Sequence, residues 1–282
     1  YEVFTLIVLF LVTITMVAGA GSIFQQYLGI DPVIGRAVMV ALMLATVLLG
    51  LRKLLDILGP IGPVIIIGII VISVVAFAGN AGAVAESDAV VAAMDPPLVK
   101  ASGFWLLSAI LYGVMNVYPL TSFASAMGAS ANSKKEAVLG AVLGCAALIV
   151  GGLLVVLSQL VNVGYIAAED VPTLALVMKY MPAVSGVFSF VLLLGIYTTI
   201  APNLWAFTQA FGDDRSKWYM VAAIAAGVAI YAVSFLPYGE LLNVIYPFVG
   251  YGAYLMIFCM IVKHCKLFYE KRFGSKKQRE GE

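Results

Sequence analysis

The chain has 282 residues, of which 63% are hydrophobic and 11% are charged, and its formal net charge at pH 7 is +1. This composition lies well outside the range of ordinary soluble domains and excludes a soluble globular fold for the bulk of the chain. The near-zero net charge carries no information about binding partners.

Eight long stretches without a charged residue follow one another along the chain. Each can supply a transmembrane helix, because a hydrocarbon core about 30 Å thick takes about 20 apolar residues at a rise of about 1.5 Å. In chain order the stretches are Val3–Phe24, Ala37–Leu51, Ile57–Ala85, Ala101–Ser133, Ala137–Ala168, Tyr180–Gly212, Trp218–Gly239 and Leu241–Val262. Their continuous apolar character excludes the alternating pattern of a membrane β-barrel, so we predict an all-α, polytopic membrane protein with eight transmembrane helices.

These helices form one predicted domain, residues 1–262, and the remaining residues 263–282 form a basic tail that is too small to bury a core. The chain begins with Tyr1 and Glu2 and enters apolar sequence at once, so we expect further sequence upstream. A signal peptide over Val3–Ser22 is a weaker alternative, because a basic n-region is absent and the apolar run is long.

Lysine and arginine residues concentrate in every second loop. One side of the membrane receives thirteen of them: Arg52, Lys53, Lys134, Lys135, Arg215, Lys217, Lys263, Lys266, Lys271, Arg272, Lys276, Lys277 and Arg279. The other side receives Arg36, Lys100 and Lys179. The positive-inside rule therefore predicts that both ends of this chain lie in the cytoplasm, with the protein in the cell membrane.

The fourth stretch contains a predicted helix break at Tyr112–Ser122, where Gly113 and Pro119 flank Asn116. Pro119 lacks an N–H group and clashes with the carbonyl of Met115, so backbone carbonyls become available to a ligand. Uncharged polar groups beside such carbonyls suit a cation or a zwitterion. The candidate substrate-binding residues are Tyr112, Asn116, Tyr118, Thr121 and Ser122. The alternative is a proline kink filled by neighbouring helices, with Asn116 bonded to another helix.

The sixth stretch carries a second polar island, Gly195–Asn203. Its Thr198 and Thr199 supply two hydroxyl groups at mid-depth, and such hard oxygen ligands suit Na⁺ better than a transition metal. We predict a Na⁺ site at this pair; the alternative is that each hydroxyl bonds a carbonyl one turn back and binds no ion. The first stretch carries a similar pair, Thr13 and Thr15.

Glycines of the first and fifth stretches are predicted to serve close helix packing rather than binding. They are Gly19, Gly21, Gly140, Gly144, Gly151 and Gly152.

The broken helix begins a run of five predicted helices, and three helices precede it. Transporters built from inverted five-helix repeats place a discontinuous helix first in each repeat. On this rule two helices are missing upstream, and the first stretch is the inverted counterpart of the sixth.

Four segments carry a family resemblance: MVAGAGSIFQQYLG (Met16–Gly29), LLGLRKLLDILGPIGPVI (Leu48–Ile65), FWLLSAILYGVMNVYPL (Phe104–Leu120) and SKKEAVLGAVLG (Ser133–Gly144). These segments resemble the YkvI family of membrane proteins, which is placed in the amino acid, polyamine and organocation transporter superfamily with the LeuT fold. The resemblance covers nearly the whole chain. It implies that the helices are the third to tenth of a ten-helix core, with Asn116 at the substrate-contacting break and the Thr198 and Thr199 pair at a Na⁺ site.

These observations predict a secondary transporter of a small organic solute such as an amino acid, coupled to Na⁺ or H⁺, with alternating access around a midplane site. An ion channel and a non-transporting scaffold or sensor are the alternatives. Neither an enzyme nor catalytic residues are expected, because the apolar stretches lack paired carboxylates, His or Cys pairs at the spacing of metal ligands, and a serine with a neighbouring base. The expected partners are the lipid bilayer and the solute, without nucleic acid; beyond a coupling Na⁺ no cofactor is expected, and the oligomeric state stays open.

Overall fold

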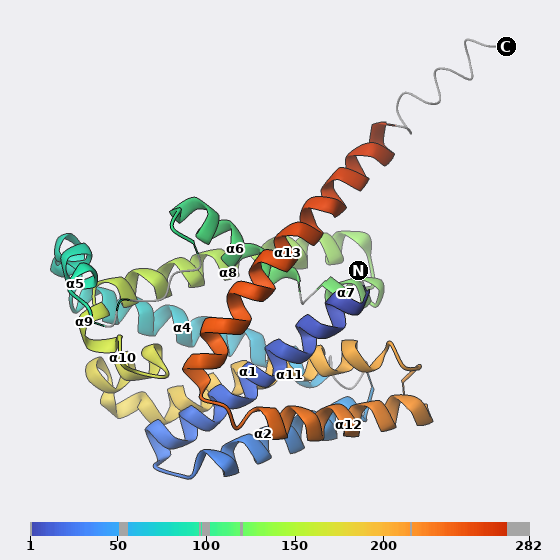
Figure 1. The fold of residues 1–282 in the computed structure, drawn as a ribbon, viewed down its shortest axis with the longest axis horizontal. Helices are drawn as coiled ribbons and strands as arrows, with labels where there is room; N and C mark the ends of the chain where they lie inside the picture. The colour runs from blue at the N-terminus through green and yellow to red at the C-terminus, as the bar shows by residue number, and fades with distance from the viewer. Residues whose placement is uncertain are drawn as a thin grey trace.

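The computed structural model describes residues 2–50, 56–95, 97, 102–118, 121–214 and 216–269, and all regular secondary structure in these ranges is helical (Figure 1). Each of the eight predicted apolar stretches contains helix. The long elements are α1 (Glu2–Leu28), α2 (Pro32–Val47), α4 (Ile61–Ala78), α6 (Trp105–Val117), α7 (Thr121–Ala129), α8 (Lys134–Leu160), α11 (Ser185–Thr208), α12 (Lys217–Val233) and α13 (Tyr238–Tyr269). Short elements lie between them: η1 (Ala81–Glu86), α5 (Ser87–Ala92), α9 (Val163–Ile166), α10 (Pro172–Tyr180) and η3 (Pro182–Val184).

Five helices in the described ranges are long and apolar enough to cross a membrane, namely α1, α4, α8, α11 and α13. Three further helices, α2, α6 and α12, are apolar but shorter. The fold is therefore that of a helical, multi-pass membrane protein, as predicted. The count of eight transmembrane helices stays a prediction, since three of the eight fall below the length that spans a bilayer without help.

The connection between α1 and α2 shows how local sequence sets a helix boundary. Gly29 adopts a φ of 64°, and the amides of Gly29 and Ile30 donate to the carbonyls of Gln25 and Phe24 at 3.1 and 3.2 Å. The Gly29 bond is the single bond of an αL motif, which a glycine favours because it has no Cβ. The carboxylate of Asp31 then accepts from the Val33 amide at 2.8 Å and caps α2.

Helix α1 forms the centre of the structure. It packs against α2, α11, α12 and α13, and most of its surface is buried, whereas α8 faces outward along almost its whole length. Small residues permit this enclosure: a Cβ added to Gly19 would lie 2.9 Å from the Tyr238 ring, and one added to Gly21 would lie 2.7 Å from Arg36 Nε. These two glycines therefore serve close packing, as predicted.

The glycines of α8 behave differently. A Cβ added to Gly140, Gly144, Gly151 or Gly152 would meet no atom of the described residues within 4 Å. The packing role predicted for them has no partner in the part of the chain that the structure describes.

The contacts among six of the helices stay the same when three of them exchange places with the other three. Helix α1 contacts α2, α12 and α13, while α11 contacts α12, α2 and α4. Exchanging α1 with α11, α2 with α12 and α4 with α13 converts each of these contacts into another that is also present, and it leaves the α1–α11 and α2–α12 contacts unchanged. In Figure 1 the two members of each exchanged pair run in opposite directions across the view.

Replacement of Gly35 on α2 by Leu tests the close packing of α2 on α1. A Cβ at Gly35 would lie 2.6 Å from Phe24 Cγ and 2.9 Å from Phe24 Cβ, so the base of a side chain must move rather than its tip. We expect Gly35→Leu to destabilise the protein by about 1–3 kcal/mol and to lower its melting temperature in detergent. Gly144→Leu is the control and leaves the melting temperature unchanged; equal melting temperatures for both variants would contradict the close contact between α1 and α2.

Candidate functional site

A cavity of about 670 Å³ lies between the N-terminal end of α1 and the C-terminal end of α11. The two helices run in opposite directions (Figure 1), so the start of one lies beside the end of the other. The lining residues are Glu2, Val3, Thr5, Leu6, Leu9, Trp205, Ala206, Gln209 and Ala210. A mostly apolar wall with a few polar groups is typical of a site for a small organic molecule.

The predicted helix break lies directly against this cavity. Helix α6 ends at Val117, and Tyr118, which follows it, is fully buried. The Tyr118 hydroxyl lies 2.8 Å from the hydroxyl of Thr5, a residue of the cavity wall, and either group can donate. On α7, the Phe123 ring meets Trp205, another wall residue, edge-on with 6.0 Å between ring centroids. Residues at the end of α6 and the start of α7 therefore support both sides of the cavity.

A polar cluster fixes the wall at the end of α11. The indole N–H of Trp205 donates to Asp214 Oδ1 at 2.9 Å, and the Gln209 amide donates to the same oxygen at 2.5 Å. Gly50 has a φ of 85°, and a Cβ there would lie 2.8 Å from Asp214 Oδ2, so the backbone of the α2 end closes around this carboxylate. Trp205 and Gln209 are thus held in one orientation toward the cavity.

Of the five predicted substrate-binding residues, Tyr118 is the one whose side chain the structure places against the cavity wall. Tyr112 is 56% exposed. The Asn116 side-chain amide donates to the Tyr112 carbonyl at 2.7 Å, a bond within its own helix rather than to another helix. Neither residue lines the cavity. Thr121 and Ser122 begin α7, but their side chains, like the whole of Pro119, lie outside the described residues.

The Thr198 and Thr199 hydroxyls both donate to the Gly195 carbonyl, at 2.9 and 3.1 Å. This is the local bonding that the alternative interpretation describes, yet each hydroxyl oxygen keeps lone-pair capacity for a cation while it donates. Pro202 lies inside α11 and supplies no N–H to the Thr198 carbonyl four residues earlier. Beside it, Asn203 is 2% exposed, and its Nδ2 finds no partner in the part of the chain that the structure describes.

Thr13 and Thr15 on α1 repeat this arrangement. Their hydroxyls donate to the carbonyls of Leu9 and Leu11 at 2.6 and 3.0 Å. The hydroxyl groups of these four threonines are therefore satisfied within their own helices, so they add no unpaired hydroxyl to the interior.

Glu2, Thr5, Trp205 and Gln209 are the wall residues with polar groups that sequence reasoning did not select. They lie at the start of the first predicted helix and at the end of the sixth, and only the pairing of these two helices brings them together. The one sequence signal that pointed toward them is the predicted counterpart relation between the first and sixth stretches.

The structure and composition together define a multi-pass, α-helical membrane protein. No family model matches the chain, and no solved structure matches it. The chain is similar to the uncharacterized membrane protein YkvI of Bacillus subtilis, with 27% identity over 269 residues that cover 93% of this chain and 73% of that protein. This similarity supports the predicted likeness to YkvI-type membrane proteins; the superfamily and the LeuT fold stay predictions.

Replacement of Tyr118 by Phe tests its contact with the cavity wall. The change keeps the buried ring and deletes the hydroxyl that meets Thr5, so we expect a loss of stability of up to about 1 kcal/mol, as is usual for a side-chain hydrogen bond in a membrane protein. Tyr112→Phe, on α6 just before Tyr118, is the matched control and should change nothing, because that ring is exposed. Thermal unfolding of both variants in detergent provides the measurement, and an effect of Tyr112→Phe as large as that of Tyr118→Phe would contradict it.

Proposed function

We propose that this protein is a secondary transporter that moves a small organic solute, such as an amino acid, by alternating access. The observation that carries the proposal is the cavity between α1 and α11, which lies against the predicted break between α6 and α7. Transporters with inverted repeats bind their solute where a discontinuous helix meets the helices of the other repeat.

The exchange pattern of helix contacts supports the same proposal. Three helices that start with α1 and three that start with α11 make equivalent contacts and run in opposite directions. An inverted repeat produces this relation, and it gives a protein two conformations of similar energy by exchanging the roles of the halves. Under the LeuT-like arrangement, α1 is the third core helix and α11 is the eighth.

The lysine and arginine distribution sets the proposed orientation. With both ends of the chain in the cytoplasm, the start of α1 and the end of α11 lie on the cytoplasmic side, and so does the cavity. The conformation of the structure then corresponds to one that opens toward the cytoplasm.

Uptake by the purified protein in liposomes tests the proposal. A panel of radiolabelled amino acids, offered with an inward Na⁺ or H⁺ gradient, should reveal saturable and gradient-dependent uptake. Trp205→Ala and Gln209→Ala should raise the KM about tenfold, because a wall contact contributes roughly 1–1.5 kcal/mol. Trp218→Ala, at an outward-facing side chain that is 71% exposed, is the matched control. Flux that does not saturate would replace the transporter with an ion channel, and a folded protein that binds no solute would support a scaffold.

The coupling ion has its own test at Thr198 and Thr199. Valine keeps the shape of threonine and removes the hydroxyl, so the double variant Thr198→Val, Thr199→Val should raise the Na⁺ concentration for half-maximal uptake roughly tenfold. Thr15→Val, at a threonine bonded in the same way on α1, should leave that concentration unchanged. Unchanged Na⁺ dependence in the double variant would remove both hydroxyls from the mechanism, whereas uptake that does not respond to Na⁺ in the parent protein would favour H⁺ as the coupling ion.

A further inference from the structure

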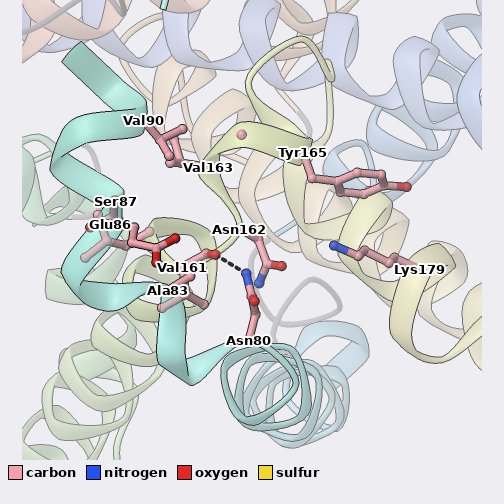
Figure 2. Close-up of a pocket in the computed structure, with 12 residues that line it drawn as sticks. Asn80, Ala83, Glu86, Ser87, Val90, Val161, Asn162, Val163, Tyr165 and Lys179 are labelled. Carbon is pink, nitrogen blue, oxygen red and sulfur yellow. Dashed lines mark hydrogen bonds between the residues drawn. The ribbon is translucent and has the colours of Figure 1, made fainter. Parts of the chain in front are cut away.

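A second cavity, of about 250 Å³, lies at the opposite end of the structure from the α1–α11 cavity, between η1 and α5 on one side and the α8–α10 connection on the other (Figures 1 and 2). The space equals that of about eight water molecules at about 30 Å³ each. This volume fits a small solute rather than a lipid or a peptide of several residues.

Two opposite charges line this cavity. Lys179 comes from the last turn of α10, and Glu86 comes from the end of η1. Both side chains are exposed, and neither has an ion-pair partner among the residues that the structure describes. Figure 2 shows the two side chains on opposite sides of the Asn80 and Asn162 pair, each with its charged end turned toward that pair.

Aromatic rings hold the Lys179 ammonium in place. Its Nζ lies 4.5 Å from the centroid of the Tyr165 ring and 5.0 Å from that of Tyr180. A cation–π contact orients an ammonium group without neutralising its charge, so the group can still donate to a carboxylate.

A network of hydrogen bonds holds the residues between the two charges. Asn162 is 3% exposed, and its amide donates to the carbonyls of Ser158 and Ala76 at 2.9 and 3.2 Å, while it accepts from the Tyr180 hydroxyl at 2.6 Å. The Asn80 amide donates to the Val161 carbonyl (Figure 2). These bonds join the end of α4 to the α8–α10 connection, and the two joined parts precede Glu86 and Lys179 in the chain.

We propose that this cavity is a binding site for a small zwitterion of the amino-acid class, with the carboxylate of the ligand on Lys179 and its ammonium on Glu86. A zwitterion pairs with both charges at once. A simple anion pairs only with Lys179 and a simple cation only with Glu86, so each leaves the other side chain without a partner. The site is separate from the α1–α11 cavity, and its occupancy does not depend on transport through that cavity.

Isothermal titration of the purified chain in detergent tests the proposal with glycine, β-alanine and 4-aminobutyrate, which differ only in the separation of their charges. Propionate and propylamine, with one charge each, are the control ligands. We expect saturable binding of at least one zwitterion and none of the single-charge ligands at the same concentrations. Glu86→Gln and Lys179→Gln should each weaken that binding about tenfold or more, while Asp88→Asn, at an acid of α5 outside the cavity lining, should not.

Exchanging the two charged residues tests whether the ligand binds at this site and not elsewhere. Glu86→Lys and Lys179→Glu should each abolish binding, and the double exchange should restore it with the ligand reversed, because a zwitterion carries both charges. Trp205→Ala should leave unchanged the part of the binding that Glu86→Gln and Lys179→Gln weaken, so that failure here and failure of the transport proposal are distinguishable. Binding that is unaffected by the single variants, or the absence of binding by all three zwitterions to a protein that elutes and unfolds like the parent, would overturn the proposal.

Discussion

The need of hydroxyl groups in lipid-embedded helices for partners inside the protein governs the contact between α1 and α11. Four threonines near the middle of these helices bond carbonyls of their own helix, so the contact can be close and dry. Toward the start of α1 the pattern changes. Thr5 meets Tyr118, and Trp205 meets Asp214, so polar groups there turn to other elements and the space between the helices opens into the cavity.

The sequence predicts the class of fold because transmembrane helices need only length and apolar composition. It does not predict which face of each helix is buried. Helices that are apolar all round carry no strong amphipathic signal, so periodicity cannot separate a face that meets protein from one that meets lipid. Gly19 and Gly144 illustrate the limit: both suit packing, yet Gly19 lies against Tyr238 while Gly144 meets nothing within 4 Å among the described residues.

The sequence also predicts only part of the candidate site. A proline near glycine, asparagine and tyrosine marks a break, and Tyr118 at that break does meet the cavity wall. The side chain of Asn116 bonds its own helix instead, a choice that depends on the rotamer and not on the residue type. Trp205 and Gln209 become neighbours of Thr5 only through the antiparallel pairing of α1 with α11, which no local pattern encodes.

The distribution of contacts also indicates where the structure can rearrange. Helices α1, α2, α11 and α12 contact one another in every combination, so this group forms one body, while α6 packs mainly on α13 and α7 reaches the group through α11. Packed interfaces change between discrete arrangements rather than deforming continuously. The Thr5–Tyr118 hydrogen bond and the Phe123–Trp205 edge contact join the two parts at the wall of the cavity. For a protein that alternates access, loss of these two contacts is the step that would let α6 and α7 move against α1 and α11, so the residues that wall the cavity are also those that hold it in its present conformation.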